Sequence, residues 1–145
     1  MNAPEPKVAV EPYLLESRDA SGVVTLTMNR PQQFNALSVE MMTALQAALD
    51  TVAADSSARV VVLGGAGKAF CAGHDLKQMK EDPSLDVYRA LFAQCTKLML
   101  TIQRIPQPVI ARVHGVATAA GCQLVATCDL AVAAEGVRFG VSGIN

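Results

Sequence analysis

The sequence contains no tryptophan, only 4% aromatic residues, and two histidines, His74 and His114, in a chain of 145 residues. No CxxC pair occurs among the four cysteines, and their separation from the histidines does not fit zinc-ligand spacing. We therefore expect no metal site and interpret the cysteines as reduced, buried thiols. Together with an N-terminus that lacks the pattern of a signal or transit peptide, they predict a cytoplasmic protein. The cysteines are Cys71, Cys95, Cys122 and Cys128.

An excess of one charge is also missing. The chain has 12 Lys and Arg against 13 Asp and Glu, a net charge of −1, and no run of basic residues. The longest apolar run, residues 116–128, contains Gln123 and two threonines and is too short and too polar to match a membrane span of about 18 apolar residues. We therefore expect neither nucleic acid nor a membrane as a partner. Hydrophobic residues still make up 51% of the chain, with a mean hydropathy of +0.29, which we interpret as buried strands plus a surface that contacts other subunits.

The order of elements predicts an α/β domain over residues 13–145, preceded by a disordered lead-in over residues 1–12, which holds three prolines and mixed charge. Ser38 is expected to cap a helix that carries apolar residues at helical spacing as far as Val52. A second apolar stripe, from Leu91 to Ile102, ends before Pro106. Four apolar, mostly β-branched runs and a fifth segment predict strands. These strands are expected at residues 23–28, 60–63, 109–113, 130–133 and around 137–141.

A glycine-rich segment, GGAGKAF at 64–70, follows the second predicted strand. As a dinucleotide fingerprint it fails because Phe70 stands where the third glycine is needed. As a Walker loop it fails because Ala69 replaces the Ser or Thr that follows the lysine, and no glycine stands at the required upstream position. The segment therefore does not support a nucleotide-binding module.

Three blocks carry the strongest signal: NRPQQFNAL at 29–37, GKAFCAGHDLK at 67–77 and the segment at 108–140 that contains HGVATAAGCQL. In their order and separation they resemble the crotonase, or enoyl-CoA hydratase/isomerase, superfamily. The resemblance implies a spiral of ββα repeats and an acyl-CoA thioester as ligand, with coenzyme A as part of the substrate and no permanently bound cofactor. It also implies a homotrimer or a dimer of trimers. Family members continue for about as long again after the position of Asn145, so we expect a crotonase-like core that is incomplete at the C-terminus.

The resemblance also implies binding residues. Backbone groups of Ala72 and His74, with Ala36 nearby, are expected to bind the adenine and phosphate end of CoA. Lys68 and Lys77 would then meet the phosphates, although both also fit the pattern of ordinary solvated lysines.

An oxyanion hole is implied in the same way, with the backbone N–H of His74 as one donor and that of Ala120 as the other. Such donors stabilise the charge that a thioester oxygen gains during reaction. Ala120 opens a predicted helix that ends near Cys128, so the helix dipole adds to its N–H. For His74 the resemblance implies a role for the backbone alone.

Two positions depart from the family pattern. Hydratases of the family use two glutamates as acid and base, and these positions are Gln123 and Gly143 here. Glutamine does not exchange a proton near neutral pH, and glycine has no side chain. We therefore expect an acyl-CoA-binding protein of the hydratase/isomerase family with poor hydratase activity. The alternative is a non-catalytic acyl-CoA binding or interaction protein.

Overall fold

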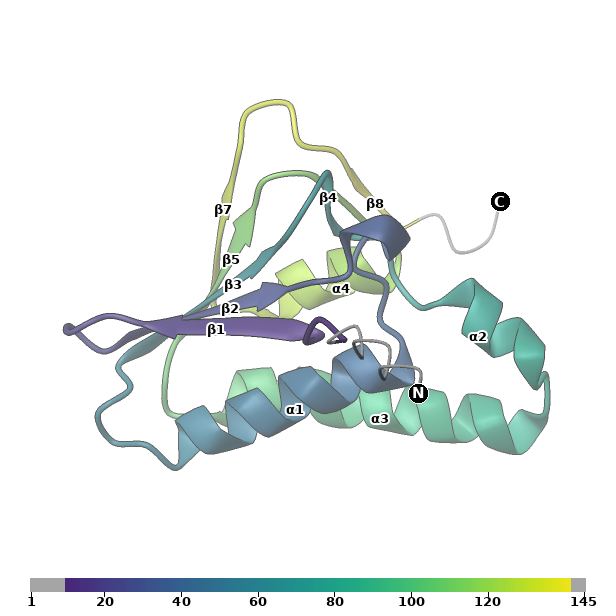
Figure 1. Cartoon of the computed structure of the whole chain (residues 1–145), viewed down its shortest axis with the longest axis horizontal. Coiled ribbons are helices and arrows are strands. Elements are labelled where there is room, and N and C mark those ends of the chain that lie inside the picture. Colours follow the sequence, from purple (N-terminus) through teal and green to yellow (C-terminus); the bar gives the residue numbers. More distant parts are fainter. Residues whose placement is uncertain (1–9, 142–145) are drawn as a thin grey trace, which may run out of the picture.

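The computed structural model describes residues 10–141, which form two β-sheets and the helices around them (Figure 1). The strands are β1 (Leu14–Arg18), β2 (Val23–Met28), β3 (Val60–Gly65), β4 (Ala69–Cys71), β5 (Val109–Val113), β6 (Val116–Thr118), β7 (Leu130–Ala133) and β8 (Phe139–Gly140). The helices are the 3-10 helix η1 (Pro31–Gln33) and the α-helices α1 (Val39–Ala53), α2 (Leu76–Glu81), α3 (Leu85–Arg104) and α4 (Ala120–Thr127). The α/β class predicted from the sequence is confirmed.

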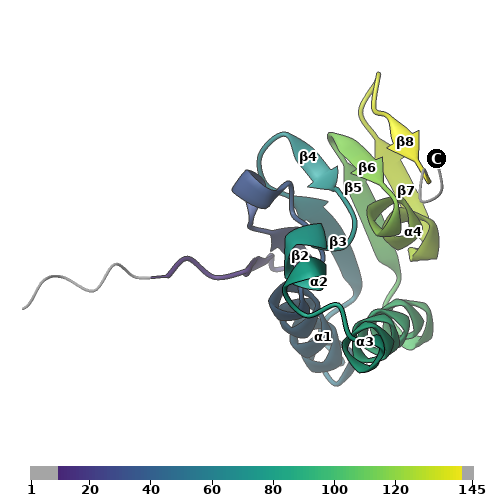
Figure 2. The ribbon, with the colours of Figure 1, turned by 90° about the vertical axis from the view of Figure 1, so that its right-hand side faces the viewer.

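The chain alternates between the two sheets. The larger sheet has the strand order β1-β2-β3-β5-β7 and the smaller one β4-β6-β8. Among the strand pairs of residues 10–141, only β1–β2 is antiparallel. From β3 onward, successive strands along the chain alternate between the two sheets. The first strand of each couple (β3, β5, β7) lies in the larger sheet, and the second (β4, β6, β8) lies in the smaller one. The chain therefore advances as a spiral of repeated units. Figure 2 shows the short strands in a row, with α1 and α3 below the larger sheet.

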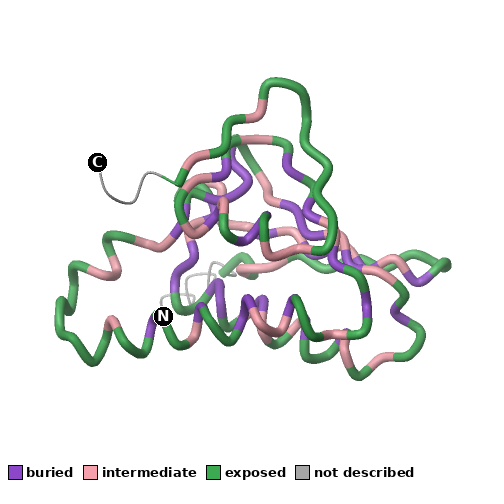
Figure 3. The backbone as a smooth tube through the Cα atoms, turned by 180° about the vertical axis from the view of Figure 1, so that it is seen from behind, coloured by how far each residue is buried: buried purple, intermediate pink, exposed green. Residues whose placement is uncertain are grey.

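Alternating burial explains why the central strands form a sheet with one packed face. In β2 every second residue is buried, which places Val24, Leu26 and Met28 in the core. The helix α1 begins where Ser38 Oγ accepts the Met41 N–H at 3.1 Å. The buried stripes of α1 and α3 complete the core, and buried segments concentrate where the sheets and helices meet (Figure 3).

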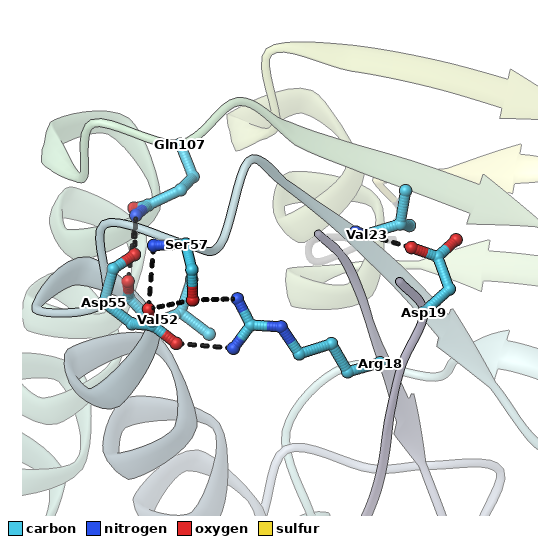
Figure 4. A network of polar contacts seen from close by, with 7 residues as sticks. All are labelled: Arg18, Asp19, Val23, Val52, Asp55, Ser57 and Gln107. Carbon is cyan, nitrogen blue, oxygen red and sulfur yellow. Dashed lines mark hydrogen bonds and ion pairs between the residues drawn. The ribbon is translucent and has the colours of Figure 1, made fainter. Parts of the chain in front are cut away.

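A polar network ties the β1–β2 hairpin to the end of α1 (Figure 4). The guanidinium of Arg18 donates to the Asp55 carboxylate and, at 2.9 Å, to the hydroxyl of Ser57. The hydrogen bond from Arg18 holds the pKa of Asp55 well below its usual range. The buried amide of Gln107 donates to the carbonyls of Val52 and Asp55, and so satisfies acceptors at the end of α1.

The predicted strands at 23–28, 109–113 and 130–133 are confirmed, the one at 60–63 extends to residue 65, and the one around 137–141 shortens to 139–140. The predicted helices are α1, α3 and α4. The sequence analysis missed β1, β4, β6 and α2. No helix among residues 10–141 is long and apolar enough to cross a membrane.

Most of the predicted lead-in, residues 1–9, lies outside the described residues. In the described end of the lead-in, residues 10–12, the carbonyls of Glu11 and Pro12 accept hydrogen bonds from the Arg30 guanidinium.

Candidate functional site

The candidate site lies where the loop after β4 meets the start of α4. Gly73 makes this approach possible, since its φ is +95°. A Cβ atom placed on Gly73 would lie 3.0 Å from Ala119 Cβ and 3.3 Å from the backbone nitrogen of Ala120. The two segments that contain the predicted donors His74 and Ala120 are therefore packed against each other.

Within the described part of the chain, both predicted donors have N–H groups without a protein acceptor. Among residues 10–141, neither the His74 N–H nor the Ala120 N–H donates a hydrogen bond to a protein acceptor. Ala120 is the first residue of α4, where N–H groups lack intrahelical acceptors and the helix dipole is positive. Ala119 before it adopts φ +50° and ψ −125°, a conformation that costs a non-glycine residue about 1–3 kcal/mol. Such strain is typical of functional sites.

A second glycine fixes α4 on the smaller sheet. A Cβ atom on Gly121 would lie 2.2 Å from the carbonyl oxygen of Cys71, the last residue of β4. Burial raises the pKa of the Cys71 thiol to about 12, so this side chain is a packing group and not a nucleophile. All four cysteines are free; Cys71 and Cys95 are buried, and the other two are half-buried.

A cavity of about 480 Å³ opens beside these loops. It brings together three predicted CoA-binding residues, Ala36, Ala72 and His74. The Ala72 N–H donates to the Phe34 carbonyl at 3.0 Å, so it is not free for a ligand, whereas the Ala72 carbonyl accepts the Thr118 hydroxyl at 3.2 Å and no other hydrogen bond from the described residues. The lining residues are Gln33, Ala36, Ala72, His74, Asp75, Leu76, Met79 and Ala119.

A polar cavity of about 380 Å³ adjoins the first and shares Gln33, Ala36 and Asp75 with it. The predicted phosphate ligand Lys77 lines this second cavity, together with Arg30. Lys68 is exposed and lines neither cavity.

Arg30 is a site residue that the sequence analysis missed, although it lies in the NRPQQFNAL block. Its guanidinium carbon stands 3.6 Å from the centre of the Tyr13 ring. The fully buried Asn35 holds the same block in place, because its amide accepts from the Arg30 N–H and donates to the Ala66 and Ala69 carbonyls, each at 2.9 Å.

Comparisons with known proteins identify the family of this chain. A family model described as enoyl-CoA hydratase/isomerase matches residues 18–145. The chain belongs to this family. The mitochondrial enoyl-CoA hydratase domain-containing protein 3 of Xenopus laevis is 44% identical over 124 residues, which cover 86% of this chain and 42% of the relative.

Solved structures show the same family fold. The crystal structure of an enoyl-CoA hydratase from Mycobacterium smegmatis has 67% sequence identity and a TM-score of 0.92, and the match covers 93% of this chain and 52% of that one. For human enoyl-CoA hydratase domain-containing protein 3 the identity is 37% and the TM-score 0.85, over 90% of this chain and 51% of the human one. The predicted crotonase-like fold is confirmed, and the chain spans about half the length of the relatives it matches.

The cytoplasmic prediction is contradicted. The similar proteins of Xenopus laevis and human carry mitochondrial names. The prediction rested on free thiols and on the absence of a recognisable leader, and free thiols do not distinguish one reducing compartment from another.

The two positions predicted to correspond to the glutamates of the family, Gln123 and Gly143, do not carry a carboxylate. Gln123 lies on α4 with its side chain exposed, and it lines neither cavity. Gly143 lies outside the described residues. The carboxylate that lines the first cavity belongs to Asp75, which accepts the N–H groups of Lys77 and Gln78 and so caps α2. In residues 10–141 no group of three or more His, Cys, Asp or Glu side chains is placed to hold a metal ion.

His74 lines the first cavity, and its side chain has contacts of its own. The imidazole is half-buried, and its Nδ1 lies 3.4 Å from the Leu37 carbonyl oxygen. Its ring meets that of Phe92 edge to face, with 5.5 Å between ring centres. Burial lowers the pKa of His74, and the Leu37 carbonyl opposes this shift. Burial therefore favours the neutral form of the imidazole.

Proposed function

We propose that this chain binds an acyl-CoA thioester and holds its carbonyl oxygen with the N–H groups of His74 and Ala120. The supporting observation is the contact at Gly73, which packs the two segments that carry these donors against each other. Two preorganised donors aimed at one oxygen stabilise the negative charge of an enolate or a tetrahedral species, and each is typically worth about 3–4 kcal/mol.

The CoA end of the ligand is proposed to run from the first cavity into the second. The carbonyls of Ala36 and Ala72 each accept one internal hydrogen bond, from the Ser38 N–H and the Thr118 hydroxyl. Each carbonyl oxygen keeps a second lone pair, which suits the amino group of an adenine. Lys77 in the polar cavity is the proposed phosphate partner, with Arg30 beside it; Lys68 is less suited because it lines neither cavity.

Binding calorimetry tests this proposal. Acetyl-CoA and crotonyl-CoA are expected to bind, whereas NAD and ATP bind more weakly, because both phosphate-loop patterns fail in this sequence. Replacing Ala36, which lines both cavities, by Trp should weaken acyl-CoA binding at least about tenfold by filling the passage between them. Ala47→Trp is the matched control, since Ala47 is exposed on α1 and lines neither cavity. Binding of NAD or ATP alone would overturn the assignment.

Hydratase activity is proposed to be weak, because a positioned acid or base contributes about 10² to 10⁴ in rate and two are replaced here. Crotonyl-CoA hydration should therefore be at least about 10² slower than in a complete hydratase. The double variant Gln123→Glu with Gly143→Glu should recover part of this rate, and Gln123→Glu alone should recover less. A wild-type turnover of about 10 s⁻¹ or more would show that other residues act as acid and base.

The exposed Gln123 also favours a second candidate, a non-catalytic acyl-CoA binding protein that keeps the donors and lacks the acid and base. In either case the proposed assembly is a homotrimer or a dimer of trimers, supported by the apolar composition and by exposed apolar residues on β7.

A further inference from the structure

The first cavity contains one side chain suited to proton transfer near neutral pH. Its described lining consists of alanines, Leu76, Met79, an amide, Asp75 and His74. Asp75 caps α2 through one carboxylate oxygen, Oδ1, which accepts the Lys77 and Gln78 N–H groups, and a carboxylate is a weak base near neutral pH. Among these residues only an imidazole combines a pKa near neutrality with an unengaged nitrogen.

The contacts of His74 define the state of its ring. A carbonyl oxygen only accepts, so the Nδ1 facing Leu37 carries the proton, and Nε2 is left with its lone pair. Phe92 from α3 packs against the ring and restricts its rotation. In the lining, the charged group beside the ring is Asp75, and α2 contributes the apolar Leu76 and Met79. Burial lowers the pKa of His74 and the Leu37 carbonyl opposes this shift, with a balance that favours the neutral ring.

We propose that the imidazole of His74 is a catalytic base that removes a proton from the α-carbon of the bound thioester. The α-C–H bond breaks, its electron pair forms the carbon–carbon double bond of the enolate, and the thioester carbonyl electrons move onto the oxygen. The proton goes to Nε2, where it exchanges with solvent, and the same nitrogen returns a solvent-derived proton to the carbon. No oxidant, reductant or further reactant is needed.

This step rests on the proposed oxyanion site, because the enolate oxygen is held by the N–H groups of His74 and Ala120. The α-carbon and the oxygen of a thioester are two bonds apart, so the base has to stand within a few ångströms of the donors. His74 carries one of the proposed donors on its own backbone and lines the same cavity, so its imidazole is the base proposed to meet this condition. It thereby replaces part of the chemistry that Gln123 and Gly143 do not provide.

Solvent exchange tests the proposal. The protein is incubated with acetyl-CoA in D₂O, and mass spectrometry follows deuterium at the α-carbon while calorimetry measures binding of the same ligand. Wild type should exchange the α-protons, and His74→Gln should exchange at least about 10² more slowly while still binding acetyl-CoA. His114→Gln, which removes an exposed imidazole that lines neither cavity, should leave exchange unchanged.

Two further measurements distinguish a role of His74 as a base from a structural role. Exchange by wild type should rise with pH as His74 loses its proton and level off below the pKa of a free histidine, about 6.5. Added imidazole should restore part of the exchange in His74→Ala. Unchanged exchange in His74→Gln, or a wild type that binds acetyl-CoA without exchanging it, would overturn the inference. A wild type that does not bind acetyl-CoA would instead overturn the proposed function.

Discussion

The strands β2 and β7 belong to the same sheet and consist of similar residues, but they differ in burial. In β2, Val24, Leu26 and Met28 are almost completely buried, whereas Leu130 and Val132 of β7 are 62% and 65% exposed. A strand in a parallel sheet is normally apolar because both of its faces are covered. The difference shows that composition identifies a strand and that its neighbours determine its burial. In the described residues β7 pairs with β5 alone.

The candidate site also has a packed part and an exposed part. Its donors and its cavity lie between well-packed segments, because Gly73 and Gly121 allow the loop after β4 and the start of α4 to touch. Gln123, further along α4, is exposed. The proposed donors and their cavity are therefore assembled within residues 10–141, whereas Gln123 is not enclosed by them.

Leucine-to-alanine substitutions should give the largest contrast between the two strands. Leu26→Ala should lower the free energy of unfolding by about 2–5 kcal/mol, because it leaves a cavity in the core. The same change at Leu130 should cost less than about 0.5 kcal/mol, since the side chain is largely in solvent. Urea denaturation of both variants measures the difference. Equal losses would mean that another chain covers β7 in solution.

The strands and helices with a clear hydrophobic period could be predicted from the sequence. Alternating or continuous apolar runs located β2, β3, β5 and β7, and helical spacing located α1 and α3. The strands β4 and β6 could not be predicted in this way, because each has three residues and is too short to show alternation. The short helix α2 has no buried residue and hence no apolar stripe, although Asp75 was a recognisable N-cap signal.

The site was predictable where a backbone motif fixes it. Ala36, Ala72 and His74 come together as expected, and Lys77 lies in the adjoining cavity. Lys68 does not join them, because a lysine in a turn is oriented by its surroundings and not by the motif. Arg30 was not predicted, since its position depends on its contacts with Tyr13 and with the carbonyls of the segment before β1.

Alanine substitutions at two glycines, Gly121 and Gly140, should give a smaller and more local difference in stability between a tightly packed position and an open one. Gly121→Ala places a methyl group 2.2 Å from the Cys71 carbonyl oxygen, so α4 has to move away from β4. We expect a loss of about 1–3 kcal/mol in unfolding free energy. Acyl-CoA binding should fall as well, because Ala120 moves with α4.

Gly140→Ala is the matched control for this prediction. The nearest heavy atom to a Cβ at Gly140 is Thr118 Cγ2, at an ordinary contact distance of 3.8 Å. Its backbone is not in the left-handed region, so the change should be nearly neutral in denaturation and in calorimetry with acetyl-CoA. If Gly121→Ala were equally neutral in both measurements, the contact between α4 and β4 would not be what positions the Ala120 donor, and the oxyanion site would need another support.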